Sequence, residues 1–221
     1  GRIEAHEAIC AWARDILLET IDMAEQEGWE VLHAIVDCVW IQDRRQRTPE
    51  ERVHDAHAFA QRVTEKVGIP LEYEDQYRFI GFVPSRVHGA GSLTKYWAFG
   101  QHGFKLRGVE ARQHSTCPWI ANMQRAALQL LVEHSDEIHG LPTPAGQRAV
   151  AQLLHSELAS LRTNNVALED LVVARRINRE LEQFDVATLA HAALLRGRLH
   201  GVTIPPGGKV KFAVIASKGT V

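Results

Sequence analysis

Apolar side chains recur every three to four residues near the start of the chain, the spacing that places them on one face of a helix. This pattern predicts a helix over residues 3–27, which Gly28 then ends. Two apolar runs follow and predict a β-hairpin over residues 29–42, with one carboxylate, Asp37, at the reversal. The apolar face of the predicted helix consists of Ile9, Trp12, Ala13, Ile16, Leu17, Ile21 and Ala24.

Asp37 is the most informative polar residue of this stretch. A charge within an apolar run costs free energy unless something pairs with it, and a metal ion is one such partner. A single aspartate in a hairpin is also a common turn residue. The residue types alone therefore leave two interpretations open, a metal ligand and a turn former.

Capping and turn signals divide the rest of the chain. Thr48, Pro49 and Glu51 form a helix start, with a capping box, for a helix that reaches residue 66 or 67 and stops at Gly68. Beyond it, the pattern changes from strands to helices near residue 112, which predicts an α+β protein with a domain boundary there. The expected strands cover residues 71–75, 77–83, 94–99, 104–107 and 209–215, and the expected helices cover residues 118–139, 144–162 and 186–199.

Composition adds a few limits. The chain has 221 residues, is 45% hydrophobic and contains no apolar run of membrane-spanning length, so no membrane partner is expected. Its start lacks a signal-peptide pattern and an initiator Met, which suggests an excised piece of a longer protein. Cys10, Cys38 and Cys117 are odd in number and widely spaced, as in reduced cytoplasmic proteins.

The charge distribution is only mildly uneven. The net charge is −2, but residues 112–221 hold 12 Lys and Arg against 9 Asp and Glu. A slightly basic C-terminal half gives weak support to a surface that faces phosphates, and a solvated charged surface would look the same. The same alternative applies to Arg175, Arg176 and Arg179, which could form a basic face or simply be solvated.

Several segments, in order, resemble family B DNA polymerases. The hairpin with Asp37 resembles the family motif Tyr-Gly-Asp-Thr-Asp-Ser, and residues 92–96 resemble its Lys-Lys-Arg-Tyr element. Residues 103–112 are similar to the segment that leads into the thumb, and Cys117, Pro118 and Gln124 follow at family spacing. Later segments resemble the end of the thumb, and they cover residues 170–173, 181–184, 190–192 and 206–215.

This resemblance implies a fold and a set of roles. Residues 1–111 would be the C-terminal half of a palm, an antiparallel sheet with packed helices, and residues 112–221 a mostly helical thumb. Asp37 would be the catalytic residue and metal ligand that this chain contributes to two-metal nucleotidyl transfer with Mg²⁺. The implied partners of the complete polymerase are primer-template DNA and dNTP, and its implied location is the cytoplasm, at the nucleoid. The implied DNA-binding residues are Thr94, Lys95, Tyr96, Arg107 and Arg112.

The motif also departs from the family pattern. Ile35 stands in place of the first Asp and Cys38 in place of Ser, and Asp37 is the second Asp, which the family uses as the direct ligand. Thr94 stands where the family has Lys, and Ser115 stands at a usual Asp position. With one metal carboxylate, the isolated chain is expected to be inactive, and its unpaired strand edges could support a dimer.

Three functions from different classes follow. The first is a DNA-directed DNA polymerase that keeps Asp37 as its metal ligand. The second is an inactivated paralogue that keeps the fold, and either DNA binding or a structural role, without polymerisation. The third is an α+β module that binds a protein partner and has no role with DNA, which the near-neutral net charge permits. Salt-dependent binding of primer-template DNA separates the third from the others, because binding dominated by phosphate contacts weakens steeply with salt.

Overall fold

The computed structural model describes residues 2–136 and 142–214. Contacts divide the chain into two compact units. The first unit comprises Gly1–Tyr77, Pro84–Leu93 and Gly100–Gly103, and the second comprises Arg78–Val83, Thr94–Phe99 and Phe104–Val221. Helices combine with small sheets in an α+β fold, which confirms the predicted fold class. None of the described helices is both long and apolar enough to cross a membrane.

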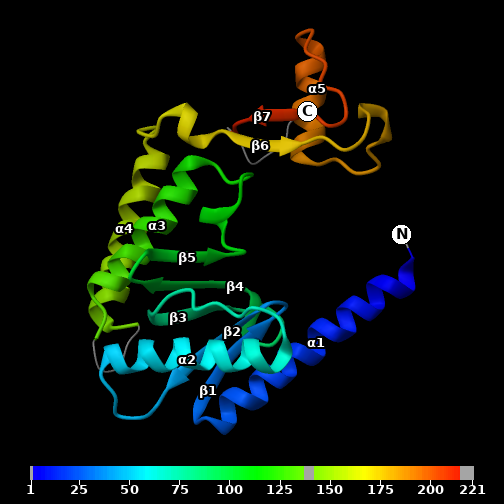
Figure 1. Cartoon of the computed structure of the whole chain (residues 1–221). Coiled ribbons are helices and arrows are strands. Elements are labelled where there is room, and N and C mark those ends of the chain that lie inside the picture. Colours follow the sequence, from blue (N-terminus) through cyan, green and yellow to red (C-terminus); the bar gives the residue numbers. More distant parts are fainter. Residues whose placement is uncertain (1, 137–141, 215–221) are drawn as a thin grey trace. The chain divides into compact units, whose positions relative to one another are not determined.

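The N-terminal part of the first unit contains two helices and a hairpin (Figure 1). Its core is formed by Ala24, Trp29, Phe59 and Val63, all buried, so the C-terminal end of the first helix, the start of the hairpin and the second helix share one apolar interior. The elements are α1 (Ile3–Gln26), β1 (Trp29–Ile35), β2 (Cys38–Asp43) and α2 (Pro49–Val67), which confirms the predicted helix–hairpin–helix order.

The ends of α2 follow from local sequence. The Thr48 hydroxyl accepts a hydrogen bond from the Glu51 backbone N–H, and the Glu51 carboxylate accepts one from the Thr48 N–H, which is the predicted capping box. Pro49 occupies the first turn, where its missing N–H costs nothing. Gly68 ends the helix in the left-handed conformation with φ of 74°.

The strand predicted over residues 71–75 is absent from the structure, which has irregular backbone there. The segment instead packs against α2. The Leu71 N–H donates to the Thr64 hydroxyl at 2.8 Å, and the Tyr73 ring lies 4.4 Å from the His57 ring. The segment thus contacts the preceding helix and has no strand partner. An alternating sequence pattern alone cannot reveal such contacts.

A three-stranded sheet of order β3-β4-β5 follows. The residues of this sheet that belong to the second unit include a row of aromatic side chains. The Phe79 ring stacks on the Phe99 ring, and the Phe99 ring lies 5.0 Å from the Phe104 ring. The strands are β3 (Tyr77–Pro84), β4 (Gly91–Gly100) and β5 (Gly103–Arg107), so the three strands predicted in this region are confirmed with small changes at their ends.

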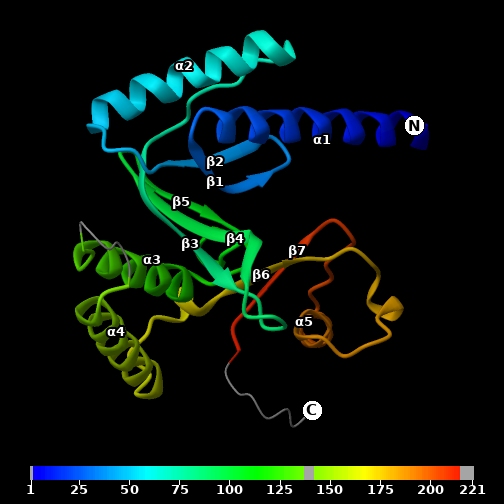
Figure 2. The same ribbon diagram turned by 90° about the horizontal axis from the view of Figure 1, so that it is seen from below.

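The remainder of the second unit begins with two helices that pack side by side, α3 and α4 (Figure 2). The Trp119 indole N–H of α3 donates to the Glu157 carboxylate of α4 at 2.8 Å. A second core, Ile177, Leu194 and Val210, joins α5 to a two-stranded ribbon. The elements are η1 (Glu110–Arg112), α3 (Pro118–Glu133), α4 (Pro144–Arg162), η2 (Leu168–Leu171), β6 (Val173–Arg176), η3 (Leu181–Gln183), α5 (Leu189–Leu199) and β7 (Lys209–Phe212).

These elements are shorter than expected at three ends. The predicted helix over 118–139 ends at Glu133, with residues 137–139 outside the described part of the chain. The predicted helix over 186–199 begins at Leu189, and the predicted strand over 209–215 ends at Phe212, with residue 215 outside the described part. The strand β6 was expected only as a basic face of unspecified structure.

Candidate metal ligand and nucleic-acid interface

The hairpin holds Asp37 at its tip. Ile35 pairs with Cys38, which leaves a two-residue turn of Val36 and Asp37 between β1 and β2. Val36 adopts φ of 53°, a left-handed conformation that tight hairpin turns require. The Asp37 side chain is exposed, so water solvates its carboxylate and the cost of burying a charge does not arise. Its availability at a rigid turn, rather than a buried charge, is what makes Asp37 a candidate ligand.

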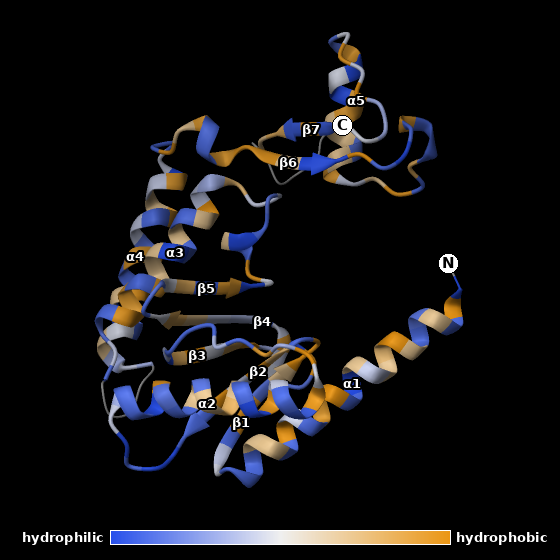
Figure 3. Ribbon diagram, in the orientation of Figure 1, coloured by the Kyte–Doolittle hydropathy of each residue, from blue (hydrophilic) through white to orange (hydrophobic). Residues whose placement is uncertain are grey.

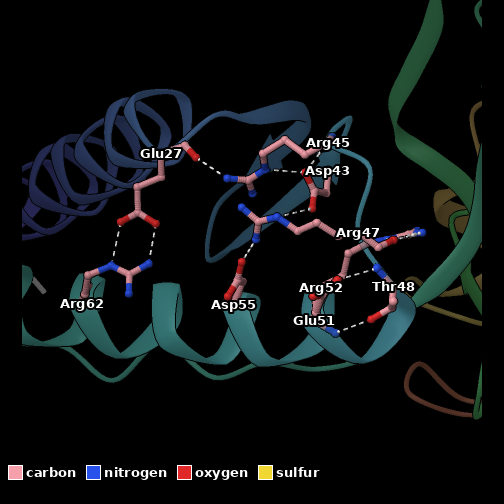
Figure 4. A network of polar contacts seen from close by, with 9 residues as sticks. All are labelled: Glu27, Asp43, Arg45, Arg47, Thr48, Glu51, Arg52, Asp55 and Arg62. Carbon is pink, nitrogen blue, oxygen red and sulfur yellow. Dashed lines mark hydrogen bonds and ion pairs between the residues drawn. The ribbon is translucent and has the colours of Figure 1, made fainter.

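A network of charged residues holds the base of the hairpin against both helices of the first unit (Figure 4). The Asp43 side chain, 1% exposed, accepts hydrogen bonds from the Arg45 backbone N–H at 3.0 Å and from the Arg45 Nε at 2.6 Å. Arg45 Nη1 donates to the Glu27 carbonyl, where α1 ends, and Arg47 pairs with both Asp43 and Asp55 of α2. The network therefore fixes where β2 leaves the hairpin.

Two carboxyl pKa values reflect this network. Burial raises the pKa of Asp43, but the hydrogen bonds and charges of Arg45 and Arg47 outweigh it and leave the pKa below its ordinary value. The hydrogen bond from Arg62 is the main cause that lowers the pKa of Glu27, whose Oε1 lies 2.8 Å from the Arg62 Nε. These roles were not predicted from the sequence, although the charged residues within 43–47, at the end of an apolar strand, were a visible signal.

His33 lies inside the hairpin at the position where the family motif has Tyr. It is buried, at 5% exposure, beside an irregular register between Val31 and His33. Burial lowers the pKa of His33, and a hydrogen bond with the backbone of Leu93 opposes this only in part. The neutral imidazole is therefore the form that the fold favours.

The chain offers a metal ion one carboxylate at the tip. Ile35, half-buried, occupies the position of the first motif Asp. Within residues 2–136 and 142–214, no group of three or more His, Cys, Asp or Glu side chains is arranged to hold a metal ion. Asp37 fits Mg²⁺ chemically as a single oxygen ligand.

The predicted DNA-binding residues of β4 differ in exposure. Thr94 and Lys95 are exposed, whereas Tyr96 is 2% exposed and its ring lies 5.8 Å from the Phe82 ring. Lys95 is therefore available to a phosphate, and Tyr96 supplies the packing contact that fixes the strand beneath it. Arg107 and Arg112 are also exposed.

Gly108 brings Arg107 next to Thr94 and Lys95. It has φ of 62°, and a Cβ built at this position would lie 2.3 Å from the Thr94 carbonyl oxygen and 3.0 Å from the Lys95 Cγ. Only glycine allows this close approach. The structure thus brings together three of the predicted DNA-binding residues, Thr94, Lys95 and Arg107.

Two residues of α3 hold the turn that carries Arg112. The Gln124 Oε1 accepts from the Ala111 N–H at 2.6 Å, and the Arg125 Nη2 donates to the Ala111 carbonyl at 2.6 Å. The Gln124 Nε2 donates to Glu110 at 2.9 Å, and this bond is the main cause that lowers the pKa of Glu110. The spacing of Gln124 was noticed in the sequence, but its clamp on η1 was not.

Comparison with known proteins assigns the chain to a family. The family model described as DNA polymerase family B matches residues 7–220, nearly the whole chain. The chain belongs to DNA polymerase family B. This confirms the resemblance that the hairpin motif and the later segments suggested.

The curated relatives are distant in sequence and much longer. A DNA polymerase of Archaeoglobus fulgidus is 19% identical over 97% of this chain and 25% of its own length. A DNA polymerase of Thermococcus kodakarensis is 24% identical over 99% of this chain and 12% of its own length. DNA polymerase 2 of Saccharolobus solfataricus is 30% identical over 39% of this chain and 12% of its own length. The chain therefore spans a quarter or less of each of these relatives.

A solved structure supports the fold. The family B DNA polymerase of Pyrobaculum calidifontis is similar over 100% of this chain and 26% of its own, with a TM-score of 0.61 and 18% identity. At this identity the likeness concerns the fold alone. Family membership and fold are thus established for the chain, whereas its activity depends on the site residues.

Proposed function

We propose that this chain is the palm hairpin and thumb portion of a DNA-directed DNA polymerase, with palm residues 1–111 and thumb residues 112–221. It binds primer-template DNA and contributes Asp37 as one ligand of Mg²⁺, while dNTP binds in the complete polymerase. One observation carries this proposal. The chain matches family B over residues 7–220, and it presents the exposed Asp37 carboxylate at the tip of an anchored hairpin.

Asp37 acts by position in this proposal. When bound, Mg²⁺ supplies charge stabilisation to the phosphoryl group that is transferred. The two-residue turn limits the conformations of Asp37, and the Asp43 network fixes the base of the same hairpin. A carboxylate held in this way loses little conformational freedom when it binds a cation.

The DNA contact is proposed for the exposed cations near Gly108. Lys95, Arg107 and Arg112 can pair with backbone phosphates, and Thr94 can donate its hydroxyl to one. Such contacts position a duplex without reading its sequence. Tyr96 supports them through its packing on Phe82.

Primer extension by the complete polypeptide that carries this chain tests the role of Asp37. We expect extension with Mg²⁺ to be lost in Asp37→Ala, and to be kept in Asp22→Ala, which removes an exposed carboxylate from α1. Binding of primer-template DNA, measured by anisotropy, should survive in both variants because neither removes a cation. Equal extension by Asp37→Ala and the unsubstituted protein would exclude Asp37 as a required ligand.

A second candidate is an inactivated family B paralogue that keeps DNA binding or a structural role. The half-buried Ile35 in place of the first motif Asp favours it, since this exchange removes a negative charge from the hairpin. In that case the unsubstituted protein gives no extension with Mg²⁺ or Mn²⁺ but still binds primer-template DNA in a salt-sensitive way. Extension that depends on Asp37 would exclude this candidate.

We also propose that the isolated chain forms a dimer through strand edges. The β1-β2 sheet has two strands, so each strand is paired along one side within it. A free edge is a template for pairing with another chain. Sedimentation of the isolated chain checks this, and a monomer at all concentrations would contradict it.

A further inference from the structure

The two halves of α1 differ in how far the rest of the first unit covers them. Figures 1 and 2 both show the N-terminal half of α1 projecting beyond the hairpin and α2. Residues 2–10 are all exposed, whereas Thr20 and Ala24, nearer the other end of the helix, are buried. Side chains of the N-terminal half are therefore accessible to a ligand or a partner.

The exposed half of α1 continues the pattern of the packed half. Residues three or four positions apart share a face of a helix, so Ile9 and Ala13 lie in line with the buried Thr20. Glu4 and Asp15 fall on the opposite face. Figure 3 shows the hydrophobic colour recurring along this half of α1. Ile9 is 62% exposed, so the face that packs at one end of the helix is open at the other.

His6 and Cys10 lie on this open face, one helical turn apart. The Cys10 Sγ is 3.7 Å from the His6 Nε2. In a tetrahedral zinc site with bonds of about 2.3 Å to sulfur and about 2.1 Å to nitrogen, these two donor atoms lie about 3.6 Å apart. The pair thus already has the separation that chelation of one zinc ion requires.

The donor types favour zinc over the magnesium proposed for Asp37. Thiolate and imidazole are characteristic zinc ligands, whereas Mg²⁺ prefers oxygen. His6 and Cys10 fill two of the four positions of a tetrahedral ion. In a two-fold symmetric pair of chains, each residue of the interface occurs on both sides, so a second copy supplies the same imidazole and thiolate again.

We propose that His6 and Cys10 of two copies of this chain together bind one zinc ion, and that this ion joins the copies through α1. Each thiol releases its proton to solvent on binding, because the thiolate is the ligand. The open face around Ile9 and Ala13 is covered when the two helices meet. The proposal goes beyond the proposed polymerase function and needs neither DNA nor Asp37.

Titration of the reduced chain with Co²⁺ tests the ligands. Co²⁺ takes the place of Zn²⁺ in such sites, and its thiolate complexes absorb in the near ultraviolet, which a carboxylate site such as Asp37 cannot imitate. We expect this absorption to saturate at one Co²⁺ for two chains and to disappear when Zn²⁺ is added. It should be lost in Cys10→Ser, and His6→Gln should weaken Co²⁺ binding by about tenfold or more.

Matched variants separate this pair from the other thiols and imidazoles. Cys38→Ser removes a half-buried thiol of the hairpin, and His54→Gln removes an exposed imidazole of α2, so both should keep the full absorption. His6→Cys places a second thiol at the same spacing and should restore strong binding. Circular dichroism should show an unchanged fold in the variants at positions 6 and 10, because both side chains are exposed.

Sedimentation tests the shared site. With one Zn²⁺ for two chains, we expect a mass at least twice that measured with a chelator, and no such increase in Cys10→Ser. The dimer proposed above through strand edges does not require a metal, so it persists with the chelator and in this variant. The two modes of association are therefore distinguishable on one sample.

Three results would overturn the inference. Absence of the thiolate absorption would show that the contact between His6 and Cys10 is only a hydrogen bond. Absorption that survives in Cys10→Ser would place the metal elsewhere. Saturation at one Co²⁺ for each chain, with no increase in mass, would exclude a second copy as the source of ligands. None of these results bears on primer-template binding or primer extension, so the proposed function stands or falls separately.

Discussion

At the scale of single residues, the buried His33 imidazole links the hairpin to pH. Its pKa is lowered because burial disfavours the charged form, and the backbone contact with Leu93 compensates only in part. The unfolded chain therefore binds a proton at His33 more readily than the folded chain. The free energy of unfolding should fall as the pH drops below about 6.5, the ordinary pKa of His, toward the lowered value.

We expect His33→Gln to remove this part of the pH dependence. Gln is uncharged at all relevant pH values, so the comparison uses the slope of unfolding free energy against pH rather than the absolute stability of the variant. Urea unfolding at pH 7.5 and 5.5 provides the slope, and His88→Gln, on an exposed loop, is the control that should keep it. An unchanged slope in His33→Gln would show that other groups carry the acid sensitivity.

At the scale of elements, the Asp43 network decides how firmly the hairpin is held. Asp43→Asn keeps the shape of the side chain but removes the negative charge that pairs with Arg45 and Arg47. Two partly buried guanidinium groups then lack this carboxylate partner. Breaking such a pair on one side costs about 3 kcal/mol of unfolding free energy. The lowered pKa of Asp43 gives the same sign, since this stability is present above the ordinary Asp pKa and is lost as the pH falls.

Urea unfolding measures this cost against an exposed pair of the same hairpin. Arg44 pairs with Glu30 at the surface, so Glu30→Gln should cost less than about 1 kcal/mol. Similar losses in Asp43→Asn and Glu30→Gln would mean that burial adds nothing to the network.

Elements with strong local signals could be predicted from sequence, and elements set by distant partners could not. The limits of α2 follow from Thr48, Glu51 and Gly68, which act within one turn of the helix. The segment 71–75 carries an alternating pattern as well, but its contacts with α2 give it irregular backbone. The register of β6 on β7 also depends on a partner more than thirty residues away, so the sequence could not predict which of Arg175 and Arg176 lies on the same face as the buried Val210.

The same distinction holds for the site at the scale of the whole molecule. Asp37 was found because an apolar strand on each side marks a hairpin, and the family resemblance then gave the residue a role. The clamp of Gln124 and Arg125 on Ala111 was not predictable, since it depends on how α3 packs against a residue 13 and 14 positions earlier in the sequence. The exposure of Lys95 against the burial of Tyr96 likewise follows from sheet packing.

The whole chain should bind DNA without extending a primer. Lys95, Arg107 and Arg112 of the candidate DNA surface are exposed, whereas the described residues form no group of three or more metal-binding side chains. Two-metal transfer needs carboxylates from separate strands, so one exposed ligand binds Mg²⁺ weakly and cannot organise the reaction. Anisotropy with a labelled primer-template, followed by gel analysis after addition of dNTP and Mg²⁺, measures both properties on one sample. Extension by this chain alone would show that it builds a complete metal site, and would refute the view that Asp37 is one ligand among several from a longer polymerase.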